Sequence, residues 1–279
     1  MKNRLESRLP LLIFLCVFMS VLIIGTLTER AKLSRLNSET ITDVEFREQQ
    51  ITDTVIKYLR KMEHKDRGKS VGLYLLDKNS DMVEKQYFQK GHLSERENIW
   101  KERPAWNSYR KVCEALWNDV IYFPVPESTK HENYQVTYVD SWMFERDFDG
   151  KRGHEGCDIM ASEDKPGLYP IVSMTDGTVV SKGWLTKGGY RLGILAPSGA
   201  YFYYAHLDSY AKIEEGDTIR AGDVIGFMGD SGYGPEGTTG MFPTHLHLGI
   251  YLYPEDVETS YNPYWILRMI EEKKLSCSF

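Results

Sequence analysis

The sequence lacks paired cysteines, an excess of positive charge and repetitive segments. None of its four cysteines belongs to a Cys-x-x-Cys pair, which excludes a zinc ribbon and provides no disulfide framework. The formal net charge is −6, so the composition gives no indication of a nucleic-acid partner. No internal repeat or low-complexity segment is present. With 42% hydrophobic and 27% charged residues, the 279-residue chain has the composition of an ordinary globular protein.

One long hydrophobic run lies near the N-terminus. Residues Leu11 to Leu27 are apolar apart from three positions, and basic residues lie on both sides of the run. A helix over these residues would be about 26 Å long, near the lower limit for crossing a bilayer. No small-residue cleavage motif of the Ala-x-Ala kind follows. We therefore expect an uncleaved membrane anchor rather than a signal peptide, with an orientation that the flanking charges leave open.

The next part of the chain has mainly helical periodicity. Apolar residues at helical spacing predict one helix over residues 43–62, whereas residues 70–88 are ambiguous. A second helix is expected from Ser94 to Trp117, with Ser94 as its N-cap in a capping box and Pro104 interrupting it. Its aromatic residues fit either a glycan-stacking surface or, more commonly, a helix-packing core: Trp100, Trp106, Tyr109 and Trp117.

After about Tyr134 the pattern changes to short apolar runs separated by Gly, Asp and Pro. This spacing is typical of an antiparallel all-β fold. The Pro-containing segment at residues 123–126 marks the break between the helical and the β regions.

A pair of histidines lies in the segment 244–249. His245 and His247 alternate with apolar residues, as expected for a half-buried strand with both imidazoles on one face. Two neutral imidazoles on a rigid strand could supply half of a zinc site, because zinc binds nitrogen ligands in tetrahedral geometry. Taken alone, the pair fits two surface histidines equally well.

The segment 153–159 supplies further candidate ligands. His154 and Asp158 are four residues apart, but the flanking glycines argue against a helix. In a strand or bent loop the even spacing still places both side chains on one side. Two histidines and a carboxylate are a sufficient protein ligand set for a catalytic zinc. His206 follows an aromatic run and, by itself, fits a core, surface or catalytic residue.

Together these segments resemble the LytM-type, or M23-like, zinc endopeptidases of the bacterial cell wall. The resemblance covers roughly residues 134 to 255. It rests on five motifs in the family's order, at residues 154–161, 176–179, 204–207, 213–229 and 245–247. No single motif is decisive, but five in register are a strong signal.

The resemblance implies a role for each of the five residues. His154, Asp158 and His247 would bind one Zn²⁺ per chain. His206 and His245 would be the unligated catalytic histidines, one accepting a proton and the other stabilising the oxyanion or protonating the leaving amine. Which of the two performs which step remains open.

The implied fold is mainly β: a small antiparallel LytM-like peptidase domain preceded by a transmembrane helix and a mostly helical region. We expect a cytoplasmic stub and anchor at residues 1–28 and a helical extracytoplasmic region at 29–130. The peptidase domain would occupy residues 131–267 and a C-terminal tail residues 268–279.

The implied function is a membrane-anchored, zinc-dependent endopeptidase that hydrolyses peptide bonds of peptidoglycan stems or cross-bridges. It would be a single-pass protein of the cell membrane with its peptidase domain outside the cytoplasm. The main alternative is a zinc-retaining LytM-like scaffold of the sporulation-channel type, or a regulator of another hydrolase, with a protein partner bound through residues 43–130. A secreted lytic toxin with a signal peptide is disfavoured by the missing cleavage motif. The presence of all five site residues favours an enzyme.

Two features depart from the family pattern. The Gly-rich segment 229–242 is longer than usual before the histidine pair, so substrate preference could differ. Cys157 lies between two expected ligands and is interpreted as a small buried apolar residue. Glu155 is expected to face solvent. No role is assigned to the remaining histidines, His64, His92 and His131.

Overall fold

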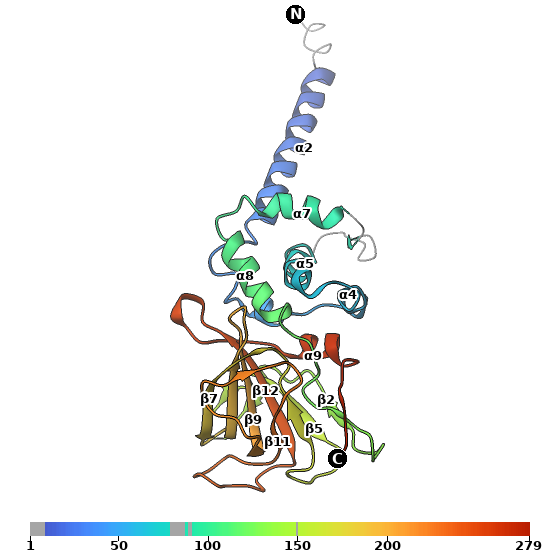
Figure 1. Ribbon diagram of the computed structural model, residues 1–279. Helices are drawn as coiled ribbons and strands as arrows, with labels where there is room; N and C mark the ends of the chain where they lie inside the picture. The colour runs from blue at the N-terminus through green and yellow to red at the C-terminus, as the bar shows by residue number, and fades with distance from the viewer. Residues whose placement is uncertain (1–8, 79–86, 89–90, 149) are drawn as a thin grey trace, which may run out of the picture.

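The computed structural model describes residues 9–78, 87–88, 91–148 and 150–279. From the N-terminus, these residues form a projecting helix, a group of packed helices and a β domain (Figure 1). The strand pairs of the large sheet in this domain are antiparallel. The predicted fold class, a mainly β domain after an N-terminal helix and a helical region, is therefore confirmed.

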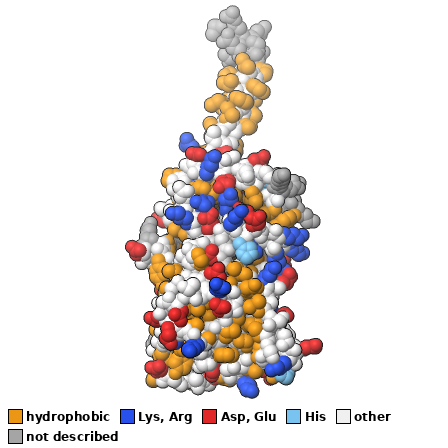
Figure 2. Space-filling view, viewed as in Figure 1, with side chains coloured by type: hydrophobic (Ala, Val, Ile, Leu, Met, Phe, Trp, Pro, Cys, Tyr) orange, Lys and Arg blue, Asp and Glu red, His pale blue; other side chains and the backbone are white. Residues whose placement is uncertain are grey.

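The projecting helix α2 spans Leu9–Leu33 and contains the predicted hydrophobic run. Its most apolar window has a mean hydropathy of 2.7, and none of that window is buried against the rest of the chain. Figure 2 shows hydrophobic side chains around this helix where it leaves the body of the molecule. A helix of this length and composition can cross a bilayer, and a signal sequence has the same character.

The helical region follows α2. Its helices are α3 (Val44–Arg47), α4 (Asp53–Leu59), α5 (His64–Asp77), α7 (His92–Trp100) and α8 (Trp106–Trp117). Helix α5 resolves the first part of the ambiguous segment 70–88 as helix. Residues 79–86 of that segment lie outside the described residues.

The prediction of one helix over residues 43–62 is wrong, because the chain leaves the helix at Gln49. This residue has a φ of 49°, in the left-handed region, and its side chain is fully buried. Its Nε2 donates to the Phe46 carbonyl (2.6 Å), and its Oε1 accepts from Trp117 Nε1 (2.8 Å). A buried amide needs such partners, and these two are reached only if the helix stops here. Helix α4 then restarts with the Thr52 hydroxyl as its cap.

The expected capping box at Ser94 is also wrong. Helix α7 begins at His92, and its N-cap is Gly91 with a φ of 91°, a conformation that glycine adopts without steric cost. The predicted interruption at Pro104 is confirmed, since α7 ends at Trp100 and α8 begins at Trp106.

The aromatic residues of α7 and α8 form core, not a glycan-stacking surface. Each side chain is at most 4% exposed: Trp100, Trp106, Tyr109 and Trp117. The hydroxyl of Tyr109 donates to the Gly72 carbonyl of α5 (2.8 Å). These residues therefore hold α5, α7 and α8 together.

The β domain contains one large sheet with two small additions. Its strands are β2 (Val136–Tyr138), β5 (Cys157–Ala161), β6 (Pro170–Val172), β7 (Gly177–Leu185), β8 (Gly189–Leu195), β9 (Tyr201–Tyr210), β10 (Thr218–Ile219), β11 (Val224–Met228), β12 (His245–Leu252) and β13 (Thr259–Tyr261). The main order is β10-β7-β8-β9-β12-β5-β2, with β11 on β9 and β6, and β13 on β12. A hairpin of β3 (Glu145–Arg146) and β4 (Arg152–Gly153) lies beside it.

Strict alternation along β12 separates the core from the site. Leu246, Leu248 and Ile250 are fully buried in the core. Burial of each such side chain contributes about 1.5–3 kcal/mol, and a one-residue slip would reverse the faces of the strand. The register of β12 therefore fixes which side His245 and His247 occupy.

The helical region is attached to the β domain by specific hydrogen bonds. The hydroxyl of Tyr261 in β13 donates to the Ile41 carbonyl (2.9 Å). Arg60 donates to the carbonyls of Arg268 and Met269 in α9 (Tyr264–Ile270), at 2.7 and 3.0 Å. Beyond α9, β14 (Ser276–Cys277) pairs in parallel with β1 (Glu127–Ser128).

Candidate active site

The candidate site lies on the face of the sheet opposite the core. In the pairing of β12 with β5, His247 is directly opposite Asp158. His154 precedes β5 in a short turn after β4 and is not in a helix, as its flanking glycines indicated. Gly156 allows this turn to pass close to β12, because a Cβ here would lie 2.5 Å from His247 Cε1.

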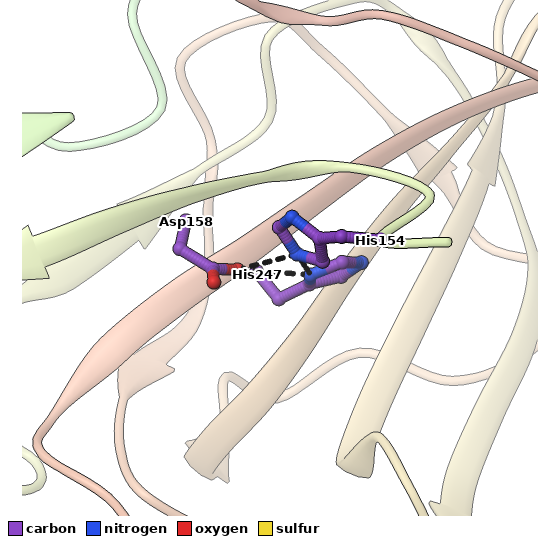
Figure 3. Close-up of side chains that lie close together, drawn as sticks. All are labelled: His154, Asp158 and His247. Carbon is purple, nitrogen blue, oxygen red and sulfur yellow. Dashed lines mark hydrogen bonds and ion pairs between the residues drawn. The ribbon is translucent and has the colours of Figure 1, made fainter. Parts of the chain in front are cut away.

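His154, Asp158 and His247 point toward one another (Figure 3). Asp158 Oδ1 lies 3.0 Å from His154 Nε2 and 3.0 Å from His247 Nδ1, and the two ring nitrogens are 2.9 Å apart. The three candidate ligand atoms fall within 4.8 Å of one another. We call these residues the His–Asp–His cluster.

The donor set of this cluster fits zinc. His154 Nδ1 lies 3.0 Å from the Ser141 carbonyl, to which it can only donate, so His154 Nε2 presents a lone pair to the cluster. Although burial alone would raise the pKa of the Asp158 carboxyl, the two imidazoles that face it, those of His154 and His247, hold this pKa well below its usual range. Two imidazole nitrogens and an ionised carboxylate are ligands that zinc accepts.

Arg146 was missed in the sequence. Its Nη2 donates to Asp158 Oδ2 at 2.6 Å, while Oδ1 of the same carboxylate faces the histidines. Arg146 therefore orients the carboxylate from the β3–β4 hairpin. It lies before the first recognised motif, and no sequence pattern connects it with the site.

His206 and His245 lie beside the cluster, with ring centroids 4.7 Å apart. His206 Nδ1 is held by the Ser231 carbonyl (2.7 Å) and His245 Nδ1 by the Pro243 carbonyl (2.8 Å). Each ring therefore keeps its Nε2 available on the opposite side. Burial lowers the pKa of His206 well below its ordinary value, so this imidazole is neutral and can accept a proton.

All five predicted site residues line one groove of about 470 Å³. The groove also contains side chains that sequence reasoning did not identify: Arg146, Arg152, Arg191, Tyr203, Tyr233 and Tyr251. Of these residues, Tyr203 and Tyr251 had a sequence signal, because each lies in an apolar run that predicts a strand. Glu155 is exposed and lines the groove, whereas Cys157 is fully buried with its thiol on the Val139 carbonyl.

The long segment 229–242 contributes to the groove, as expected from its position. Tyr233 stacks on Phe148 with ring centroids 4.1 Å apart and an interplanar angle of 5°. Phe242 contacts His206, with centroids 4.5 Å apart. The segment therefore encloses His206 with aromatic rings and supplies the Ser231 carbonyl that orients it.

An antiparallel sheet carrying a His–Asp–His cluster and two further histidines in an open groove defines a site of the metallopeptidase class. Residues 152–262 match peptidase family M23, and residues 31–119 match the LytM N-terminal domain. A solved LytM structure from Ruminococcus gnavus, provisionally assigned as a glycyl-glycine endopeptidase, is 49% identical. The match covers 89% of this chain and 98% of that one, with a TM-score of 0.82. The chain belongs to peptidase family M23, a family of zinc metallopeptidases.

Two curated relatives have endopeptidase names. The L-Ala–D-Glu endopeptidase of Bacillus subtilis (strain 168) is 44% identical over 150 residues, which are 53% of this chain and 43% of that protein. The glycyl-glycine endopeptidase ALE-1 of Staphylococcus capitis is 33% identical over 66 residues, or 23% of this chain and 18% of that protein. The chain thus spans less than half the length of each of these relatives.

Proposed function

We propose that this protein is a zinc-dependent endopeptidase that hydrolyses peptide bonds of peptidoglycan. One zinc ion per chain would be bound by His154, Asp158 and His247. The observation that carries the proposal is the convergence of three candidate ligand atoms in a groove that two further histidines share. The family and the names of the relatives support the same class of reaction.

Zinc in this position would polarise a peptide carbonyl and lower the pKa of a bound water. The chain's own residues supply the rest of the chemistry. Neutral His206 accepts a proton on Nε2, and its orientation is fixed by the Ser231 carbonyl. His245 presents its Nε2 3.9 Å from Asp158 Oδ1; once this nitrogen has taken up a proton, it would donate it to a developing oxyanion or to the leaving amine. The geometry is equally compatible with His245 as the proton acceptor and His206 as the donor.

The relatives' names point to two kinds of bond. Glycyl-glycine linkages occur in cross-bridges, whereas an L-Ala–D-Glu linkage joins residues of a stem peptide. Of the two curated relatives, the longer match at higher identity is to the L-Ala–D-Glu endopeptidase, whereas the solved structure at 49% identity bears the glycyl-glycine name only as a provisional assignment. We therefore assign this chain to the stem peptide.

We also propose that α2 anchors the protein in the cell membrane, with the β domain outside the cytoplasm where peptidoglycan lies. The unburied apolar surface of α2 supports this assignment. In the proposed division, the anchor lies within residues 1–28, the helical region within 29–130, the peptidase domain within 131–267 and a tail at 268–279. The scaffold alternative, with a protein partner on residues 43–130, is not favoured, because the family and its named relatives are peptidases.

The proposal is tested by incubating the zinc-loaded full chain, in detergent, with peptidoglycans of different stem and cross-bridge chemistry. Mass spectrometry of the products identifies the cleaved bond. We expect new amino termini within the stem peptide. Cleavage confined to glycine cross-bridges would contradict the assignment of the bond, and no cleavage of any peptidoglycan would contradict the function.

A further inference from the structure

Four basic residues line the groove: Arg146, Arg152, Lys187 and Arg191. Arg146 has a partner in Asp158. In contrast, Nε and Nη1 of Arg191 and Nε of Arg152 are buried and have no hydrogen-bond partner among the described residues. Burying charged donors without acceptors costs free energy. A substrate bound in the groove could supply the acceptor that these atoms lack.

Arg191 lies on the same face of the sheet as the His–Asp–His cluster. In β8 the neighbouring Leu192 is buried in the core, so Arg191 projects from the groove face. Strand β9 lies between β8 and β12, so Arg191 is two strands from His247. At about 4.8 Å per strand, this is about 10 Å across the sheet. A substrate residue next to the scissile bond is within that distance.

Tyr203 connects the two arginines to the cluster. Burial raises the pKa of Tyr203, and the charges of Arg191 and Arg152 act on the same phenol in the opposite direction. Both arginines line the same groove as Tyr203, although Arg191 comes from β8 and Arg152 from β4. The ring of Tyr203 is 6.0 Å from that of His247, centroid to centroid.

Apart from Asp158, the acidic residues of the groove lie near Tyr251. Its hydroxyl donates to the Glu155 carbonyl (3.1 Å), and Glu258 accepts a hydrogen bond from Tyr253 (2.8 Å). The rings of Tyr203 and Tyr251 are neighbours, with centroids 6.2 Å apart, so the two arginines lie on the Tyr203 side of this pair and Glu155 and Glu258 on the Tyr251 side. An anionic group of a bound peptide would be attracted to the first and repelled by the second.

We propose that Arg191 and Arg152 form a carboxylate-binding subsite that holds the free carboxylate of an acidic substrate residue beside the scissile bond. The planar guanidinium group matches a carboxylate with two parallel hydrogen bonds, which makes arginine specific for this group. The subsite deepens the endopeptidase function proposed above and rests on it. It selects a stem peptide with a free glutamyl carboxylate over a glycine bridge, which has no side-chain charge.

The test compares two soluble stem peptides that contain the L-Ala–D-Glu linkage. In one the glutamyl residue has a free carboxylate, and in the other this carboxylate is converted to a carboxamide. The zinc-loaded full chain, Arg191→Gln and Arg191→Lys are compared for kcat, KM and equilibrium binding of both peptides. Arg220→Gln makes the same charge change at an exposed arginine outside the groove and serves as the control.

We expect the parent to prefer the free carboxylate by about 10- to 100-fold in kcat/KM, because hydrogen bonds between charged groups are strong. Arg191→Gln should lose this preference through a raised KM for the carboxylate peptide, with unchanged zinc content. Arg191→Lys should retain part of it, and Arg220→Gln all of it.

Two results would overturn the subsite: a parental preference in Arg191→Gln, or equal use of both peptides by the parent. A parent that cleaves neither peptide would overturn the endopeptidase function instead. In that case the binding measurements still decide the subsite, since it requires tighter binding of the carboxylate peptide that Arg191→Gln abolishes.

Discussion

At the scale of single residues, four of the proposed site residues are each held by a neighbouring group. A backbone carbonyl fixes the orientation of His154, another that of His206 and a third that of His245. Arg146 holds the second oxygen of Asp158. Each of the three carbonyls accepts from Nδ1 of its imidazole, so Nε2 of the neutral ring carries the lone pair that can bind a metal or a proton.

The ligand assignment predicts different outcomes for two histidine variants. His247→Ala should lose most bound zinc, because two remaining protein ligands hold the metal poorly. His206→Ala should keep its zinc but lose about 10²–10⁴-fold in turnover. Metal analysis and peptidoglycan assays on the same preparations measure both. Stoichiometric zinc in His247→Ala, or parental turnover in His206→Ala, would show that the roles are assigned wrongly.

The position of Arg146 predicts that Arg146→Gln weakens zinc binding by about 10- to 100-fold, because the carboxylate of Asp158 loses its orienting partner. Competition with a chelator of known affinity measures this. Lys151→Gln is the matched control, since Lys151 is an exposed cation in the same hairpin region and is paired with Glu145. Equal zinc affinity in Arg146→Gln and Lys151→Gln would exclude the orienting role.

At the scale of elements, strands were easier to predict than helices. The alternation of His245, Leu246 and His247 specifies a strand with two faces, and β12 has this form. The helical periodicity of residues 43–62 was real but local, because the buried amide of Gln49 has partners that no local pattern contains. Trp117, whose indole N–H donates to the side-chain oxygen of Gln49, is 68 residues away. Arg146 and Arg191 were not predicted for the same reason, since the roles proposed for them depend on contacts between different strands.

The break at Gln49 can be tested by stability measurements. Gln49→Ala should lower the free energy of unfolding by about 1–3 kcal/mol, because the indole N–H of Trp117 is left buried without an acceptor. Gln50→Ala is the matched control, as Gln50 is exposed. Chemical denaturation of both variants provides the comparison. A loss no greater than that of Gln50→Ala would mean that the amide does not determine this turn.

At the scale of the whole molecule, a projecting apolar helix precedes a body of helices and sheet (Figure 1). The motifs in the sequence predicted the β domain because they occur in the family's order, and the five residues that they suggest for the site line one groove. They could not establish the fate of α2, since a membrane span and a signal sequence have the same composition. The placement of the helical region on β13 and α9 also depends on contacts between distant segments.

The anchor proposal predicts that the mature protein keeps residues Leu11 to Leu27 and remains with membranes after extraction with alkaline carbonate, while detergent releases it. The apolar surface of α2 is the reason, since nothing in the rest of the described chain covers it. Fractionation and N-terminal sequencing make the measurement. A mature N-terminus downstream of Thr28 would show that the helix is a cleaved signal sequence.

The central claim is that one zinc ion in the His–Asp–His cluster makes this chain a peptidoglycan endopeptidase. The most direct test is a titration: the full chain is stripped of metal, zinc is added back in known amounts, and the release of new amino groups from peptidoglycan is followed. The account predicts background release without metal and a linear rise that saturates at one zinc per chain. Parental release after complete removal of zinc, or a fully loaded chain that leaves every peptidoglycan intact, would contradict it.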